Sequence, residues 1–107
     1  MRRSLAAAVI AVIVAAPTQP VSAEPQTRRI EMKDVAFMPA QVTVHAGDTL
    51  EWDNEDIVAH TATSKAGGFD MALLPGRKGS AVLTRPGTFT YICRYHPNMT
   101  GTITVEP

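Results

Sequence analysis

The chain has 107 residues, ten basic and ten acidic side chains, and a hydrophobic share of 45%. This length suffices for one small hydrophobic core and excludes a large cleft between two domains. The charge balance argues against nucleic acid and against an anionic membrane surface as partners.

The first 23 residues have the layout of a secretory signal peptide. Arg2 and Arg3 give a basic start, residues 5–16 form a short apolar run, and small residues precede Ala23. The apolar run is too short to span a bilayer comfortably, although an uncleaved membrane anchor is the alternative. We predict a signal peptide at 1–23, a single domain at 24–107, export to the periplasm, and no membrane association after cleavage.

The mature part of the chain reads as short strands separated by turns, without a helical period of apolar residues. In the first strand the apolar residues change from even-numbered positions, Ile30 and Met32, to odd-numbered ones after Lys33-Asp34. This change in alternation predicts a β-bulge. Further on, Val42 to Val44 and Leu50 to Trp52 alternate on either side of a Gly47-Asp48 turn, which predicts a hairpin with one buried face.

Residues 65–80 contain several glycines and a proline, so we expect a loop there with short strand pieces around Phe69 and Val82. The strand that ends at Cys93 places that cysteine on the same face as Phe89 and Tyr91. Seven or eight such strands predict an all-β fold, a Greek-key β-sandwich.

Cys93 is the single cysteine, so no disulfide can form within the chain. A buried, inert thiol is the simplest explanation of such a residue. In an oxidising compartment an exposed thiol is a liability, and a bound metal is the alternative explanation.

The segment after Tyr91 offers a thiolate, an imidazole and a thioether at the spacing Cys-x2-His-x2-Met, from Cys93, His96 and Met99. Each alone is explained as a core or turn residue, but the three together favour a metal site. Pro97 restricts His96 to extended geometry and so directs its ring. For the fourth ligand we choose His60 over His45, because His45 alternates outward beside a turn.

Thioether sulfur is a poor ligand for zinc and a good one for copper. Two imidazoles, a thiolate and a weak axial methionine form the blue-copper, or type 1, electron-transfer site. We therefore predict one copper ion held by His60, Cys93, His96 and Met99.

The residues resemble the cupredoxin family, and within it the short-loop amicyanin-like group. Nearly all of the mature chain takes part in the resemblance, through Phe37-Met38-Pro39, Val42-Thr43-Val44, Ala46 to Asn54, His60 to Ser64, Pro86 to Tyr91 and the ligand loop ending in Met99-Thr100-Gly101. The two-residue gap between His96 and Met99 is similar to amicyanin. Tyr95 and Thr61 depart from the proline and asparagine common in that group.

The resemblance implies a cupredoxin sandwich, an electron port at the exposed edge of His96, and redox proteins as partners. A quinoprotein dehydrogenase donor and a c-type cytochrome acceptor are the partners it suggests. We expect a monomer that is an electron carrier and not an enzyme, since an oxidase or nitrite reductase needs a second copper site. A module that transports or stores copper is the main alternative function, and a catalytic Cys-His pair would leave His60 and Met99 unexplained.

Overall fold

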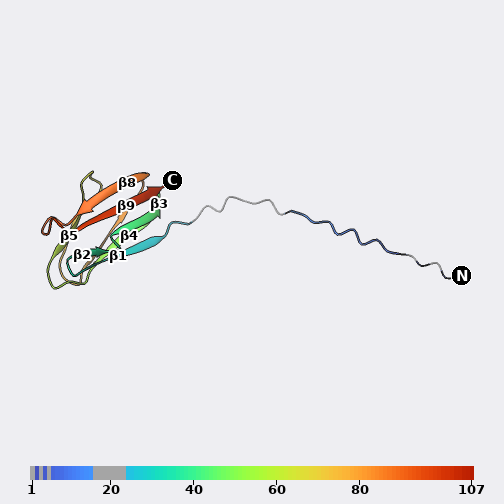
Figure 1. Cartoon of the computed structure of the whole chain (residues 1–107), viewed down its shortest axis with the longest axis horizontal. Coiled ribbons are helices and arrows are strands. Elements are labelled where there is room, and N and C mark those ends of the chain that lie inside the picture. The colour runs from blue at the N-terminus through green and yellow to red at the C-terminus, as the bar shows by residue number, and fades with distance from the viewer. Residues whose placement is uncertain (1, 3, 5, 16–23) are drawn as a thin grey trace.

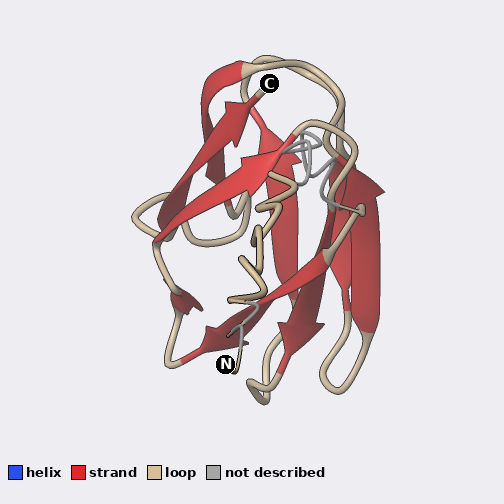
Figure 2. Ribbon diagram, turned by 90° about the vertical axis from the view of Figure 1, so that its right-hand side faces the viewer, coloured by secondary structure: helices blue, strands red, loops and turns tan. Residues whose placement is uncertain are grey.

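The structure is a computed structural model that describes residues 2, 4, 6–15 and 24–107. In this part of the chain it consists of strands and turns without a helix, as Figure 2 shows, which confirms the predicted all-β sandwich. None of the described residues belongs to a helix that could span a membrane. The predicted cleavage point after Ala23 lies outside the described residues.

The first sheet has four strands in the order β2-β1-β4-β7. Strand β1 runs parallel to β4 and places Ile30 opposite Trp52, and both side chains are fully buried. The strands are β1 (Thr27–Lys33), β2 (Ala36–Met38), β4 (Thr49–Asn54) and β7 (Lys78–Val82).

The second sheet has five strands in the order β3-β9-β8-β5-β6 and lies against the first (Figure 1). Its strands are β3 (Gln41–His45), β5 (His60–Ser64), β6 (Asp70–Leu73), β8 (Gly87–Ile92) and β9 (Thr100–Glu106). As predicted, Cys93 and Tyr91 share the buried face. On β9, Ile103 and Val105 are buried as well.

Aromatic side chains fill the core between the two sheets. The rings of Trp52 and Tyr91 meet edge to face with centroids 5.6 Å apart, and Phe37 packs on Tyr91 at 4.4 Å. A Cβ atom at Gly101, opposite Tyr91 on β9, would overlap the tyrosine ring. Because these aromatic rings are closely packed, the core gives the loops at either end a rigid support.

The predicted hairpin between residues 42 and 52 is wrong. Strand β3 pairs with β9 in the second sheet and β4 with β1 in the first, so the turn between them carries the chain from one sheet to the other. Gly47 takes a φ of 97° in that turn. Alternation reports which face of a strand is buried but not which strand lies beside it.

The change in apolar alternation after Lys33 marks a tight hairpin turn and not the predicted β-bulge. Lys33 pairs with Ala36, and the two residues between them, Asp34 and Val35, have φ values of 54° and 55°. Two successive positive φ angles characterise the mirror-image turn that joins twisted antiparallel strands. Neither residue is the glycine or asparagine that usually marks such a turn, so the sequence signal was absent.

Residues 65–80 hold more strand than predicted, since β6 and most of β7 lie there. Both are edge strands whose side chains are mostly exposed or half-buried, so their apolar alternation is weak. Gly79 on β7 admits the Met71 side chain, whose sulfur would be 2.6 Å from a Cβ at that position. The glycine that we read as a breaker is therefore a packing residue inside a strand.

Asp48 gives the fold a pH-dependent contribution to its stability. Its carboxylate accepts hydrogen bonds from the backbone N–H groups of Gln26 and His45, at 2.9 and 2.8 Å, and these bonds lower its pKa from the ordinary 3.8. The stabilisation is therefore present above pH 3.8 and is lost as the pH falls through the lowered pKa. We expect Asp48→Asn to reduce the free energy of unfolding at neutral pH.

Urea denaturation of the wild type and of Asp48→Asn at a series of pH values measures this contribution. The difference between the two proteins should shrink as the pH is lowered below 3.8. A difference that stays constant down to the acid limit would show that the Asp48 charge is not involved.

Candidate metal centre

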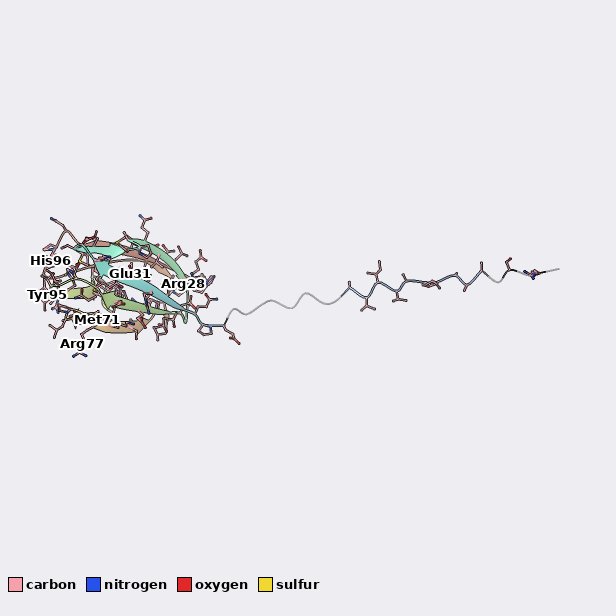
Figure 3. The ribbon with its side chains drawn as sticks, turned by 90° about the horizontal axis from the view of Figure 1, so that it is seen from below. Arg28, Glu31, Met71, Arg77, Tyr95 and His96 are labelled. Carbon is pink, nitrogen blue, oxygen red and sulfur yellow. The ribbon has the colours of Figure 1, made fainter. Side chains whose placement is uncertain are left out.

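The predicted ligands come from two segments that meet at one end of the sandwich. His60 is the first residue of β5, while Cys93, His96 and Met99 lie in the loop between β8 and β9. Figure 3 shows Tyr95 and His96 at this end of the domain and Arg28 nearer the other. Because β5 and β8 pair antiparallel in the same sheet, the start of one lies beside the end of the other.

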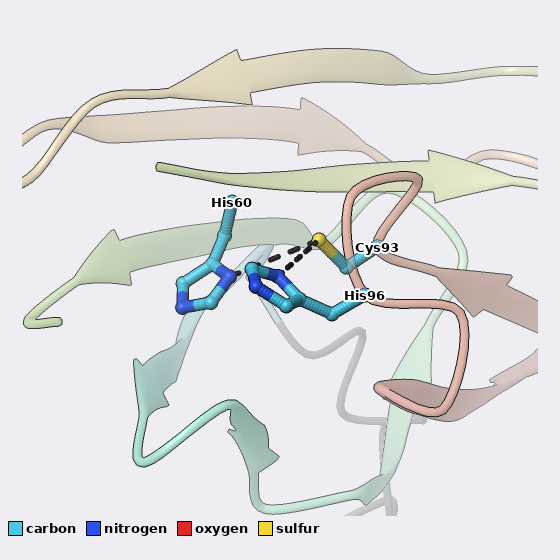
Figure 4. A group of neighbouring side chains, drawn as sticks. All are labelled: His60, Cys93 and His96. Carbon is cyan, nitrogen blue, oxygen red and sulfur yellow. Dashed lines mark hydrogen bonds between the residues drawn. The ribbon is translucent and has the colours of Figure 1, made fainter. Parts of the chain in front are cut away.

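His60, Cys93 and His96 form a group whose donor atoms all lie within 4.8 Å of one another. Figure 4 shows both imidazoles turned toward the cysteine sulfur, with Cys93 Sγ 3.8 Å from His60 Nδ1 and 3.7 Å from His96 Nδ1. The first two residues are fully buried, whereas His96 is half-buried. One small cation at the centre of this group can contact all three donors.

Met99 completes the loop and is 2% exposed. Its backbone N–H donates to the His96 carbonyl at 2.8 Å, and its carbonyl accepts from the Cys93 N–H at 3.0 Å. These two bonds close the loop on itself, so the spacing Cys-x2-His-x2-Met produces a compact turn. The sulfur atoms of a cysteine and a methionine are thereby held in one loop.

Thr61 joins the ligand loop to β5 through two hydrogen bonds. Its backbone N–H donates to Cys93 Sγ at 3.3 Å, and its hydroxyl oxygen accepts from the Arg94 N–H at 2.8 Å. Thr61, which stands where an asparagine is common in the amicyanin-like group, therefore still binds the ligand loop.

The surroundings of Cys93 favour its thiolate, the form that binds metal. Burial by itself raises the pKa of the thiol, but the Thr61 N–H, the two imidazoles and the Tyr95 N–H outweigh it and lower the pKa to about 6. The group is thus ready to bind a soft cation near neutral pH.

Asp56 is a contact of the site that the sequence did not reveal. Its Oδ2 atom lies 2.6 Å from His60 Nε2, on the side of the ring away from Cys93. Burial tends to raise the pKa of this carboxyl, but the N–H groups of Val35 and Asp34 and the His60 ring lower it below its usual value. In the sequence Asp56 is one of several acidic residues between positions 48 and 56, and only its place four residues before His60 sets it apart.

His45 is not part of this group. It pairs with Glu106 at the far end of β3 and β9, and its ring lies 3.5 Å from the Glu106 carboxylate. Strand β9 spans the length of the sheet between the two ends, about 20 Å at the usual rise per residue. The choice of His60 over His45 therefore agrees with the placement of both residues.

Comparison with known proteins places this geometry in a family. The family model described as a cupredoxin-like domain matches residues 4–105. The chain belongs to the cupredoxin-like family.

Several relatives agree with this assignment. The chain is 29% identical over 83 residues to amicyanin-alpha of Methylorubrum extorquens, covering 72% of this chain and 70% of that protein. It is 35% identical over 86 residues to the plastocyanin of Scenedesmus fuscus, covering 67% of this chain and 88% of that one. The solved structure of a purple cupredoxin from Nitrosopumilus maritimus superimposes with a TM-score of 0.67 at 25% identity, over 73% of this chain and 98% of the other.

Family, fold and donor set together identify a blue-copper electron-transfer protein. The donors fit the ion, because two imidazoles and a thiolate are the strong ligands of type 1 copper sites, and His60, Cys93 and His96 would supply them. When bound, copper supplies a one-electron couple between Cu(I) and Cu(II). The protein holds the donors in place through the hydrogen bonds described above.

The Thr61 hydroxyl can be tested without any metal. In Thr61→Val the Arg94 N–H loses its acceptor, so we expect the copper-free protein to lose about 1–3 kcal/mol of unfolding free energy. Urea denaturation measures the loss, with Thr90→Val, an exposed hydroxyl on β8, as the control. Equal losses in the two variants would show that the hydroxyl does not hold the loop.

Proposed function

We propose that His60, Cys93, His96 and Met99 hold a single type 1 copper ion and that the protein shuttles single electrons between redox partners. The observation that supports this most directly is that three donor atoms, carried by β5 and the ligand loop, lie within 4.8 Å of one another. In this proposal the two Nδ1 atoms and the thiolate would supply the strong ligands, and the Met99 thioether would supply a weak one.

The donors are suited to a carrier because the chain fixes them independently of oxidation state. The Thr61 N–H donates to the Cys93 sulfur, the Met99 carbonyl accepts from the Cys93 N–H, and Asp56 binds the far side of the His60 ring. A site held in this way changes little when one electron arrives or leaves, so little reorganisation opposes the transfer. Neither a water nor a substrate needs a place among the ligands.

We place the protein among carriers and not enzymes because the third histidine is remote. A copper oxidase or nitrite reductase needs a second metal site with further histidines. Among the described residues His45 stands at the opposite end of the sheet, paired with Glu106. We further propose that residues 1–23 direct export to the periplasm, which N-terminal sequencing of the exported protein would test by a mature start at Glu24.

Electrons reach the site through His96 in this proposal, since it is the one half-buried residue of the three. Apolar side chains on the neighbouring loops form what we call the apolar rim, and each is more than 40% exposed. These side chains are Val35, Ile57, Val58, Leu74 and Tyr95. An exposed apolar surface of this kind suits weak, transient docking of a redox protein, such as a quinoprotein dehydrogenase donor or a c-type cytochrome acceptor.

Loading the purified protein with Cu(II) tests the ligand set. We expect an intense visible band from thiolate-to-copper charge transfer and a narrow copper hyperfine splitting in the EPR spectrum. Cys93→Ser and His60→Ala should abolish the band, and Met99→Leu should shift it, because the axial ligand is weak.

His45→Ala is the matched control, since it removes a histidine at the opposite end of the sheet and should leave both spectra unchanged. A colourless complex with wide hyperfine splitting would reject the electron carrier. Rapid loss of copper to a chelator in both oxidation states would favour copper transport or storage instead.

Electron self-exchange between copies of the protein tests the apolar rim. Ile57 is 95% exposed, so Ile57→Lys leaves the core intact while placing a charge on the rim. Losing roughly 1.4 kcal/mol of apolar contact in the encounter complex would slow exchange about tenfold. NMR line broadening in mixtures of reduced and oxidised protein measures the rate.

Val82→Lys is the control, because Val82 is 61% exposed but pairs with Thr49 at the other end of the first sheet. It should leave the self-exchange rate close to that of the wild type. An equal effect of both substitutions would show that net charge, and not docking through the rim, controls the rate.

A further inference from the structure

The carboxylate of Asp56 connects the buried histidine of the metal centre to a turn that is distant in sequence. Oδ1 accepts from the Asp34 N–H at 2.7 Å, and Oδ2 accepts from the Val35 N–H at 3.0 Å. Oδ2 also lies 2.6 Å from His60 Nε2, and the Asp56 side chain is only 13% exposed. One carboxylate thus joins the β1–β2 turn to the first residue of β5.

The turn presents its two N–H groups to Asp56 because of its unusual backbone. Asp34 and Val35 both have positive φ angles, a conformation that is costly for a β-branched residue such as Val35. Successive N–H groups in such turns converge on one side and form a small concave site for an anionic oxygen. The Asp56 carboxylate occupies that site.

The loop that carries Asp56 is fixed from the other side by Asn54. Asn54 Oδ1 accepts from the Asp56 N–H at 3.0 Å, and Asn54 Nδ2 donates to the carbonyls of Val58 and Leu73 at 2.9 and 2.8 Å. The Glu55 N–H donates to the Met32 carbonyl at 2.9 Å. Asp56 is therefore held at its backbone and at both carboxylate oxygens.

We propose that Asp56 is a positioning residue for the metal centre: held by the Asp34–Val35 turn, its carboxylate keeps the proton of His60 on Nε2 and leaves Nδ1 free to bind the ion. The inference rests on the proposed copper site and deepens it. A carboxylate on the far nitrogen of a metal-binding histidine sets the tautomer and orientation of the ring and raises its basicity. The Nδ1 atom that faces Cys93 then carries no proton, and its lone pair is free to bind the metal ion.

The charge of Asp56 also acts on the redox couple. A negative charge close to the site stabilises Cu(II) more than Cu(I), because the oxidised ion carries one more positive charge. Its removal should raise the reduction potential. Loss of such a contact also lowers metal affinity about 10–100-fold.

Three substitutions in the full chain test the proposal. Asp56→Asn removes the charge but keeps the size, and Asp56→Glu keeps the charge but displaces the carboxylate. Glu55→Gln is the matched control, because it removes one negative charge from the exposed neighbouring residue. Voltammetry gives the reduction potential, and long-range proton–nitrogen NMR of the copper-free protein at pH 8 gives the tautomer of His60.

We expect Asp56→Asn to raise the potential clearly above those of the wild type and Glu55→Gln, with Asp56→Glu in between. In the copper-free wild type the neutral His60 ring should carry its proton on Nε2, and in Asp56→Asn the ring should become a mixture of tautomers. Equal potentials and equal tautomers in Asp56→Asn and Glu55→Gln would overturn the proposal.

If Asp56→Asn does not fold, Asp56→Glu decides, and a potential and a tautomer identical to those of the wild type would overturn the proposal. Failure of the copper site itself is recognised separately. In that case the wild type would lack the thiolate-to-copper band, whereas the tautomer of the copper-free protein would still report on Asp56.

Discussion

The metal centre depends on the junction between Thr61 and the ligand loop. A single threonine donates its backbone N–H to the sulfur of Cys93 and accepts the N–H of Arg94 with its hydroxyl. These bonds tie the start of β5 to the end of β8, and His60 precedes Thr61 directly in β5. Two predicted donors, His60 and Cys93, are 33 positions apart in sequence, and their Nδ1 and Sγ atoms thereby come within 3.8 Å of each other. The junction therefore helps to hold the His60 ring beside the sulfur of Cys93.

The two ends of the sandwich have different roles, which follow from the order of the strands and loops. Strands carry the rigid aromatic core, and the loops at one end carry the donors, the half-buried His96 and the apolar rim. The opposite end holds the turn stabilised by Asp48 and the exposed pair of His45 and Glu106. An electron carrier needs a buried site close to one surface, and this arrangement supplies it.

Much of the fold and the proposed site could be predicted because the signals were local. The donors Cys93, His96 and Met99 share one seven-residue segment, and alternation revealed the strands that lead into and out of it. Strand partners could not be predicted in the same way, since the buried face of β3 is the same whether it pairs with β4 or with β9. Asp56 was missed because its contacts reach back to Asp34 and Val35, whose turn lacks the usual glycine.

X-ray absorption at the copper edge, on the loaded protein in both oxidation states, tests the central claim most directly. We expect one sulfur and two nitrogen atoms at bonding distance in each state, with small changes on reduction, and loss of the sulfur in Cys93→Ser. A shell of nitrogen and oxygen atoms without sulfur, or a change in the number of strong ligands on reduction at neutral pH, would contradict it.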